Sequence, residues 1–137
     1  VQLTLEDVVY AAESIAKHGV DAIETSGGTI RETRNVMAKP GITSPEQEAC
    51  FADAASAVKA AVKVPVILVG CLRSASIMQS ILDKGIADMV SLSRPFVREP
   101  DLVNKLAAGQ AKASCVSCNA CFNPRGLKCI LDNPEQK

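Results

Sequence analysis

Small and basic residues follow two apolar segments of the sequence, at the points where a strand would end. Gly70–Ser74 reads GCLRS and includes Arg73, and Ser93–Pro95 reads SRP. Glycine lets backbone N–H groups approach an anion closely, and an arginine such as Arg94 offers a planar fork of donors. A helix N-terminus after the strand would add partial positive charge. Alone, each residue also fits a solvated rim or a tight turn, but the combination indicates a phosphate site.

A second group of chemically capable residues lies near the C-terminus. Its four cysteines are separated by two, two and seven residues, and they are Cys115, Cys118, Cys121 and Cys129. Four thiolates at this spacing can surround one centre, and in a cytosolic protein they indicate a metal before a disulfide. Three interpretations stay open: a [4Fe–4S] cluster, zinc held by the same thiolates, and a set of free thiols.

Alternating helices and strands must position both groups. Apolar periodicity, capping residues and glycine stops predict helices over residues 5–18, 44–62, 74–84 and 101–108, and strands over 20–26, 64–70 and 86–92. The segment Val64–Gly70 is continuous and β-branched, as is typical of a strand buried on both faces. Every connection between strands contains a helix, so we expect an α/β fold with parallel strands.

In such a sheet, ligands bind where the strands end at their carboxyl side. We therefore expect Gly70 and Arg94 to meet at one edge, with Ser26–Gly28 at the end of the first strand. A parallel sheet of three strands keeps two open edges, which favours a partner. His18, in the last turn of the first helix, and Cys50, among alanines, are interpreted as structural, with Cys50 in the core.

Composition limits the possible functions. The chain has 137 residues, 47% of them apolar, and 15 basic residues balance 15 acidic ones. This balance favours neither nucleic acid nor an anionic membrane surface as a partner. The longest apolar run is too short to cross a bilayer and no signal segment is evident, so a cytoplasmic location is expected.

Three segments carry a resemblance to a known family. VPVILVGCLRS, GIADMVSLSRPFVREPDLVNK and SCVSCNAC resemble the C-terminal part of the Old Yellow Enzyme-like flavin oxidoreductases, particularly the NADH:flavin oxidoreductase and 2,4-dienoyl-CoA reductase branch. GVDAIETSGG is similar to the sixth strand of that family's barrel. The resemblance implies the last three strands of an FMN-binding (β/α)8 TIM barrel that uses NADH or NADPH to reduce a small molecule.

The resemblance also implies roles for individual residues. Gly70, Cys71 and Ser93 would offer backbone N–H groups to the FMN phosphate, and Arg94 its side chain. Cys71 stands where the family usually has a second glycine, and its contact should survive unless the position requires a positive φ. The dienoyl-CoA reductase branch has a [4Fe–4S] cluster in the region of the tail, which would make Cys115, Cys118, Cys121 and Cys129 its ligands.

The predicted organisation is a barrel part over residues 1–112 and a Cys-rich tail over residues 113–137. Three strands cannot close an eight-stranded barrel, so the catalytic residues are expected outside this chain. The chain alone should be inactive, and the rest of the barrel or a homo-oligomer should complete it. The alternative is a fragment of a non-redox phosphate-binding α/β barrel with a zinc-binding tail.

Overall fold

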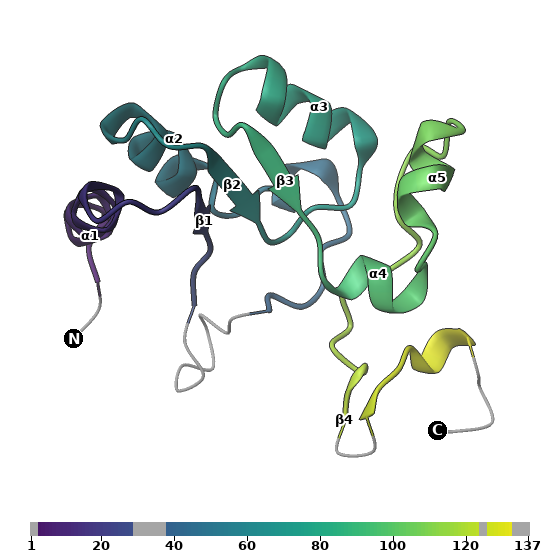
Figure 1. Cartoon of the computed structure of the whole chain (residues 1–137). Coiled ribbons are helices and arrows are strands. Elements are labelled where there is room, and N and C mark those ends of the chain that lie inside the picture. Colours follow the sequence, from purple (N-terminus) through teal and green to yellow (C-terminus); the bar gives the residue numbers. More distant parts are fainter. Residues whose placement is uncertain (1–2, 29–37, 124–125, 133–137) are drawn as a thin grey trace.

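The computed structural model describes residues 3–28, 38–123 and 126–132. Figure 1 shows a layer of helices against a small sheet, with the C-terminal tail extending away from α4. The helices are α1 (Leu5–Lys17), α2 (Ala52–Ala61), α3 (Ala75–Asp83), α4 (Arg94–Arg98) and α5 (Leu102–Ala107), with 3₁₀ turns η1 (Pro45–Gln47) and η2 (Ile130–Asp132). The strands are β1 (Ile23–Thr25), β2 (Val66–Val69), β3 (Met89–Ser91), β4 (Phe122–Asn123) and β5 (Gly126–Leu127).

The three longer strands form a parallel sheet in the order β1-β2-β3. Ile23 lies beside Val66 in the register, and Leu68 lies beside Val90. The predicted parallel α/β arrangement is therefore confirmed. Within the described residues, β1 and β3 each pair with one neighbour, so the sheet has the two open edges expected from the sequence.

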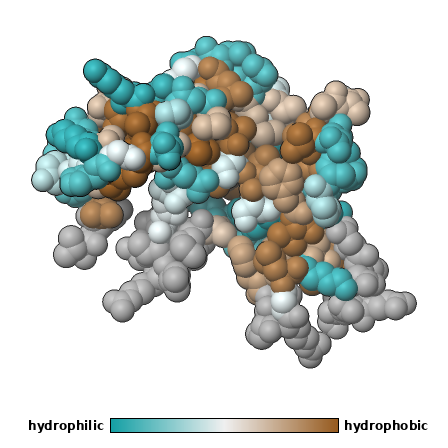
Figure 2. Space-filling model, viewed as in Figure 1, coloured by the Kyte–Doolittle hydropathy of each residue, from teal (hydrophilic) through white to brown (hydrophobic). Residues whose placement is uncertain are grey.

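Helices cover one face of this sheet. Val66 and Leu68 of β2 are fully buried, and they belong to one core with Val58 of α2 and Ile81 of α3. Alternate residues of a strand point to opposite faces, and on the other face Met89 remains 44% exposed. Figure 2 shows apolar residues gathered in the middle of the molecule, and they continue downwards into the tail.

Helix α1 begins and ends close to where the sequence predicts. The Thr4 hydroxyl accepts the Asp7 N–H at 3.2 Å, and the Asp7 carboxylate accepts the Thr4 N–H at 2.8 Å. This reciprocal capping satisfies two N–H groups that the first turn leaves unpaired. At the other end His18 caps the helix, and its Nδ1 lies 2.7 Å from the Ser14 carbonyl oxygen, in keeping with a structural role.

The single helix predicted over residues 44–62 is wrong. The chain forms the turn η1, passes through Ala49 at φ +52°, and starts α2 only at Ala52. The physical reason is a long-range interaction, because the Glu48 carboxylate accepts the backbone N–H groups of Arg73 and Ser74 at 2.8 Å each. The interruption of the helix lets Glu48 face these donors.

The first and third strands are shorter than predicted. The Ile23 N–H donates to the carbonyl oxygen of Pro65, directly before β2, at 2.9 Å, and β1 begins there. Before β3, Asp88 accepts the Val66 N–H on its side chain at 2.7 Å and pairs with Lys59 at 2.7 Å. The Asp88 N–H still donates to the Val66 carbonyl oxygen at 2.8 Å, but the Val66 N–H is taken by the Asp88 side chain, and the paired register of β3 starts at Met89.

The segment after β3 also differs from the expectation. Residues 94–98, interpreted from the sequence as a strand end and loop, form the short helix α4 with Pro95 in its first turn. Proline fits this position because it has no N–H to leave unpaired. The helix predicted over residues 101–108 is confirmed as α5, with Asp101 and Ala108 as its caps.

The tail packs back onto the body before it extends. The Ala113 N–H donates to the Arg73 carbonyl oxygen at 2.8 Å, and the Ala75 N–H donates to that of Ala111 at 2.9 Å. Ala113 is fully buried. None of the helices in the described ranges is long and apolar enough to cross a membrane.

Candidate functional site

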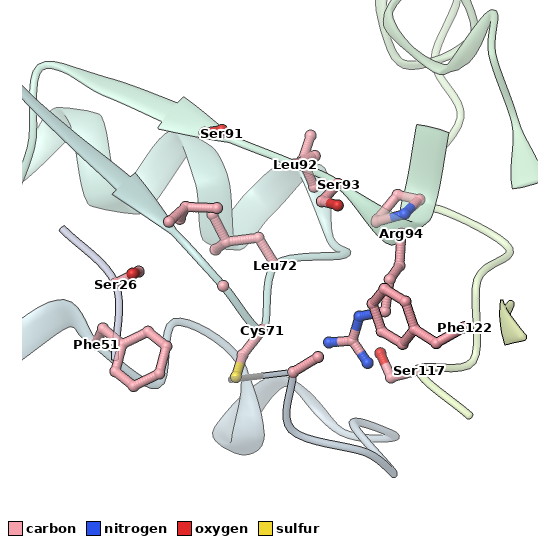
Figure 3. Close-up of a pocket in the computed structure, with 14 residues that line it drawn as sticks. Ser26, Phe51, Cys71, Leu72, Ser91, Leu92, Ser93, Arg94, Ser117 and Phe122 are labelled. Carbon is pink, nitrogen blue, oxygen red and sulfur yellow. The ribbon is translucent and has the colours of Figure 1, made fainter. Parts of the chain in front are cut away.

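A pocket of about 230 Å³ lies at the carboxyl ends of β2 and β3. We call it the phosphate pocket, and Figure 3 shows the residues around it. All four residues predicted to bind a phosphate line it, since Gly70 and Cys71 follow β2 while Ser93 and Arg94 follow β3. The remaining walls include Ser26, Ala38, Phe51, Leu72, Ser117 and Phe122. The parallel pairing of β2 and β3 brings the two predicted segments together.

Arg94 supplies the positive charge of this pocket. Its Nη1 donates to the Lys39 carbonyl oxygen at 3.0 Å and to the Asn119 side-chain oxygen. Figure 3 shows the guanidinium beside Ser117 and Phe122. Within the described residues both recorded hydrogen bonds leave from Nη1, so Nε and Nη2 remain for an anion. A guanidinium can bind phosphate oxygens through two parallel N–H donors.

Backbone donors face the same space. Within the described residues, the N–H groups of Cys71, Ser93 and Arg94 donate to no other backbone group. Buried or half-buried N–H groups are seldom left without an acceptor. An anion in the pocket is one acceptor that would satisfy them, and the residues present therefore fit a phosphate group.

The two residues after β2 adopt left-handed backbone conformations. Gly70 has φ +110° and Cys71 has φ +59°. Cys71 therefore occupies a position with positive φ, the condition under which its N–H contact with the phosphate was not expected to survive. A non-glycine residue in this conformation is strained by about 1 kcal/mol or more. The turn still leaves the Cys71 N–H without a backbone acceptor, so the contact predicted from the family resemblance is retained as a proposal.

Cys50 is bonded to Cys71 and is not simply a core residue. The two sulfur atoms form a disulfide, with the Cα atoms 5.7 Å apart. The interpretation of Cys50 as an ordinary buried thiol is therefore wrong. Its position among alanines resembled a helix interior, but the break before α2 turns its side chain towards the end of β2. The disulfide links the pocket loop to residue 50.

The N-terminus of α3 does not serve the pocket as expected. The Arg73 and Ser74 N–H groups donate to Glu48, and the Ser74 hydroxyl donates to the same carboxylate at 2.6 Å. An internal carboxylate therefore occupies the place predicted for a bound anion. Arg73 is also not a rim residue, since it is 9% exposed and donates through Nη1 to the Ile42 carbonyl oxygen at 2.6 Å.

Phe51 explains why two of the strand ends carry glycine. A Cβ atom added at Gly27 would lie 2.5 Å from its ring, and one added at Gly70 would lie 2.9 Å from it. A Cβ atom at either position would force the Phe51 ring to shift, so the ring occupies the space that both glycines leave open. Gly70 therefore admits an aromatic wall of the pocket as well as a tight turn.

The four cysteines of the tail border a second, small cavity of about 20 Å³. We call it the cysteine cavity. All four are free thiols, Cys115 and Cys121 are buried, and Cys118 is exposed. Burial raises the pKa of the Cys121 thiol, and the neighbouring Cys115 raises it further. The soft thiol donors suit iron or zinc, yet in the part of the chain that the structure describes no three ligand-type side chains are arranged to hold a metal ion.

Several residues of the site could not be found from local sequence patterns. Glu48, Phe51, Ser117, Asn119 and Phe122 reach it from segments far from the strand ends. The sequence gives a weak indication for Phe51 alone, because the chain has only three Phe, one Tyr and no Trp, so each aromatic side chain is a candidate wall of a binding site. The others become functional neighbours only through long-range contacts.

Comparison with known proteins identifies the family of the chain. The sequence model of the NADH:flavin oxidoreductase / NADH oxidase family matches residues 2–113. This chain belongs to that family. Its membership favours the redox interpretation over the non-redox phosphate-binding alternative.

Named relatives of this family are longer than the chain. A metal reductase of Desulforamulus reducens is 31% identical over 127 residues, covering 88% of this chain and 18% of the relative. A bilirubin reductase of Mediterraneibacter gnavus is 27% identical over 137 residues, covering 95% of this chain and 21% of the relative. The chain thus spans about a fifth of the length of these curated relatives.

A solved structure supports the fold. Morphinone reductase, a variant in complex with tetrahydroNAD, superimposes with a TM-score of 0.54 at 24% identity, over 80% of this chain and 25% of that chain. Its structure is an Old Yellow Enzyme TIM barrel. The three parallel strands and their helices are therefore part of an α/β barrel.

Proposed function

We propose that this chain supplies the FMN phosphate site of an FMN-dependent NAD(P)H oxidoreductase. The observation that carries the proposal is the meeting of Gly70, Cys71, Ser93 and Arg94 at one pocket. Family membership supports the flavin as the phosphate-bearing ligand. The barrel part would cover residues 1–112 and the Cys-rich tail residues 113–137.

Each residue would have a separate task. The backbone N–H groups of Gly70, Cys71 and Ser93 would bind phosphate oxygens, and the Arg94 guanidinium would neutralise the phosphate charge. The bound flavin would supply hydride transfer between a nicotinamide and an acceptor. The catalytic residues would lie on parts of the barrel that this chain does not contribute.

Arg94→Ala in the complete protein that carries this chain tests the phosphate site. Loss of a charge-assisted hydrogen bond should weaken FMN binding by about 1–3 kcal/mol, measured by the quenching of flavin fluorescence. Lys84→Ala is the control, because Lys84 is an exposed cation that lines neither the phosphate pocket nor the cysteine cavity. Unchanged FMN affinity in Arg94→Ala would contradict the assignment.

The chain by itself should oxidise no NADH, even with added FMN. Stabilising a transition state needs groups on both faces of the flavin, and one sheet edge offers only part of them. The rest of the barrel, or further copies of the chain, would cover the open face that carries Met89. NADH oxidation by the isolated chain above the rate of free FMN would overturn this.

We further propose that Cys115, Cys118, Cys121 and Cys129 bind a [4Fe–4S] cluster. Support comes from the gathering of all four thiols around one cavity and from their soft donor chemistry. A bound cluster would supply one-electron transfer, and the thiolates would hold it beside Arg94. Anaerobically purified protein should contain about four iron atoms per chain. Zinc in place of iron would keep the ligands and remove the electron-transfer role, and absence of both metals would refute the site.

The acceptor would be a small molecule, and the location cytoplasmic, where NADH or NADPH is the reductant. The two relatives described above are named for different acceptors, a metal and bilirubin. The balanced charge of the chain supports neither nucleic acid nor membrane as a partner. Turnover with a panel of acceptors, under NADH and NADPH separately, would define the substrate class.

A further inference from the structure

The disulfide between Cys50 and Cys71 lies at the wall of the phosphate pocket. Cys71 lines the pocket directly, and in Figure 3 it lies between the Phe51 ring and the Arg94 guanidinium. The Cys50 sulfur packs against the same loop, since a Cβ atom added at Gly70 would lie 3.9 Å from it. The bond therefore joins the loop after β2, which carries a proposed phosphate donor, to the residue that precedes Phe51.

The disulfide also holds a conformation that a free cysteine avoids. Cys71 has φ +59°, and in this region the Cβ atom of any residue except glycine crowds the backbone. Within the described residues, the Cys71 N–H group has no backbone acceptor while the residue borders the pocket. Without the bond, the loop is free to relax towards negative φ, and this relaxation turns the N–H group away from a bound phosphate.

The bonding and exposure of the two cysteines favour a bond that forms and breaks. The four tail cysteines are free thiols although they border one cavity, whereas Cys50 and Cys71 are bonded. Disulfides of cytoplasmic proteins are rare, and those that occur usually act in redox sensing or catalysis. Cys50 is half-buried and Cys71 is 5% exposed, so a thiol that attacks this bond reaches the Cys50 sulfur first.

We propose that the Cys50–Cys71 disulfide is a redox switch that sets the affinity of the phosphate pocket for FMN. This inference rests on the proposed FMN site. The oxidised bond holds the Cys71 N–H group towards the phosphate, and its reduction by a small thiol releases the loop and weakens FMN binding.

Reduction of the switch is a thiol–disulfide exchange in two steps. The thiolate of the small thiol attacks the Cys50 sulfur, the Cys50–Cys71 bond breaks, and Cys71 leaves as a thiolate. A second thiolate then attacks the small thiol's sulfur in the mixed disulfide, and Cys50 leaves in turn. The two protein thiolates take up the two protons that the small thiols released. Two electrons thus pass to the protein, and the products are two protein thiols and one small disulfide.

The affinity for FMN is measured in the complete protein that carries this chain, oxidised and after treatment with reduced glutathione as the small thiol. Riboflavin, which lacks the phosphate, is measured in parallel. Alkylation and mass spectrometry count the thiols, and reduction should add two, at Cys50 and Cys71. In the wild type, reduction should weaken FMN binding by about tenfold, the scale of one hydrogen bond to a charged group. Riboflavin affinity should not change.

Two variants separate the switch from a general loss of structure. Cys50→Ala removes the bond but keeps Cys71, so its FMN affinity should equal that of the reduced wild type and should not respond to thiol. Cys71→Gly also removes the bond, but glycine adopts the left-handed conformation without strain and keeps the N–H group. It should bind FMN more tightly than Cys50→Ala, again without a response to thiol. Both variants keep the tail cysteines and so control for effects of thiol there.

Three results would overturn the switch. They are a bond that glutathione does not reduce, an FMN affinity of the wild type that is unchanged after reduction, and an equal loss of FMN and riboflavin affinity. Hydrogen exchange at the Cys71 N–H group is a readout that needs no flavin, and reduction of the wild type should accelerate it. If the protein binds no FMN but this exchange responds, the proposed function fails and the redox control of the loop stands. If FMN binds and its affinity does not respond, the switch fails alone.

Discussion

The phosphate pocket and the cysteine cavity share Arg94, but the chain holds their walls in different ways. The loop after β2 is fixed by the Cys50–Cys71 disulfide and by the hydrogen bonds of Glu48. The turn at Cys118–Cys121 is held by the Asn119 side chain and by backbone bonds at Ser117 and Phe122, and its cysteines are free thiols. The comparison teaches that covalent and hydrogen bonds within the chain fix the loop of the phosphate pocket. The four thiols around the cysteine cavity, in contrast, form no disulfide.

Loss of Glu48 should break this comparison most strongly. In Glu48→Ala the N–H groups of Arg73 and Ser74 lose their acceptor, and the cost of leaving such donors unpaired is about 4 kcal/mol for the set. Hydrogen exchange at residues 70–75 should accelerate, and the free energy of unfolding should fall. Glu6→Ala, which removes an exposed carboxylate on α1, is the control and should change little. Protection of residues 70–75 equal to the wild type would show that Glu48 does not hold the pocket loop.

Reduction of the Cys50–Cys71 disulfide should have the next largest effect. The bond closes a loop with a sequence separation of 21 residues, for which the chain-entropy contribution is about 3 kcal/mol. Reductant should therefore lower the unfolding free energy of the wild type by that amount. In Cys50→Ala, reductant should have no additional effect. An equal response of both proteins to reductant would place the stabilising bond elsewhere.

The junction between the body and the tail should respond to acid. Burial opposes the ionisation of Glu99, but hydrogen bonds from Gln110 and Ser114 outweigh it and lower the pKa of this carboxyl to about 2. Since the folded-state pKa lies below the ordinary value of 4.5, the stabilisation is present above that value and is lost as the pH falls towards 2. The loss should be about 2 kcal/mol.

Glu99→Gln should remove this part of the pH dependence. The measurement is the free energy of unfolding from about pH 5 down to about pH 2, the range over which the carboxyl takes up its proton in the unfolded and folded chain, together with hydrogen exchange at Ser114. The tail junction should open in the wild type as the carboxyl is protonated, while the phosphate-pocket loop stays protected. The same pH slope in both proteins would assign the acid response to other carboxyl groups.

Local patterns in the sequence were sufficient for the elements that depend on nearby residues. Thr4 and Asp7 predict the start of α1, and the β-branched run ending at Gly70 predicts β2. They failed over residues 44–62, because Glu48 and Cys50 have partners more than 20 residues away. A long-range carboxylate contact or disulfide leaves no periodic signal in the sequence, so it cannot be found by reading neighbours.

The sequence by itself determined the parallel α/β class and the convergence of Gly70, Cys71, Ser93 and Arg94. The physical reason is that βαβ connections force consecutive strands to end at one edge, so residues after those ends must meet. Only the tertiary structure decided that Glu48 occupies the α3 N-terminus, that Phe51 fills the space over Gly27 and Gly70, and that Asn119 contacts Arg94. These contacts depend on how the loops at residues 38–51 and 115–122 pack against the sheet edge, and that packing is set by distances and directions that only the folded chain defines.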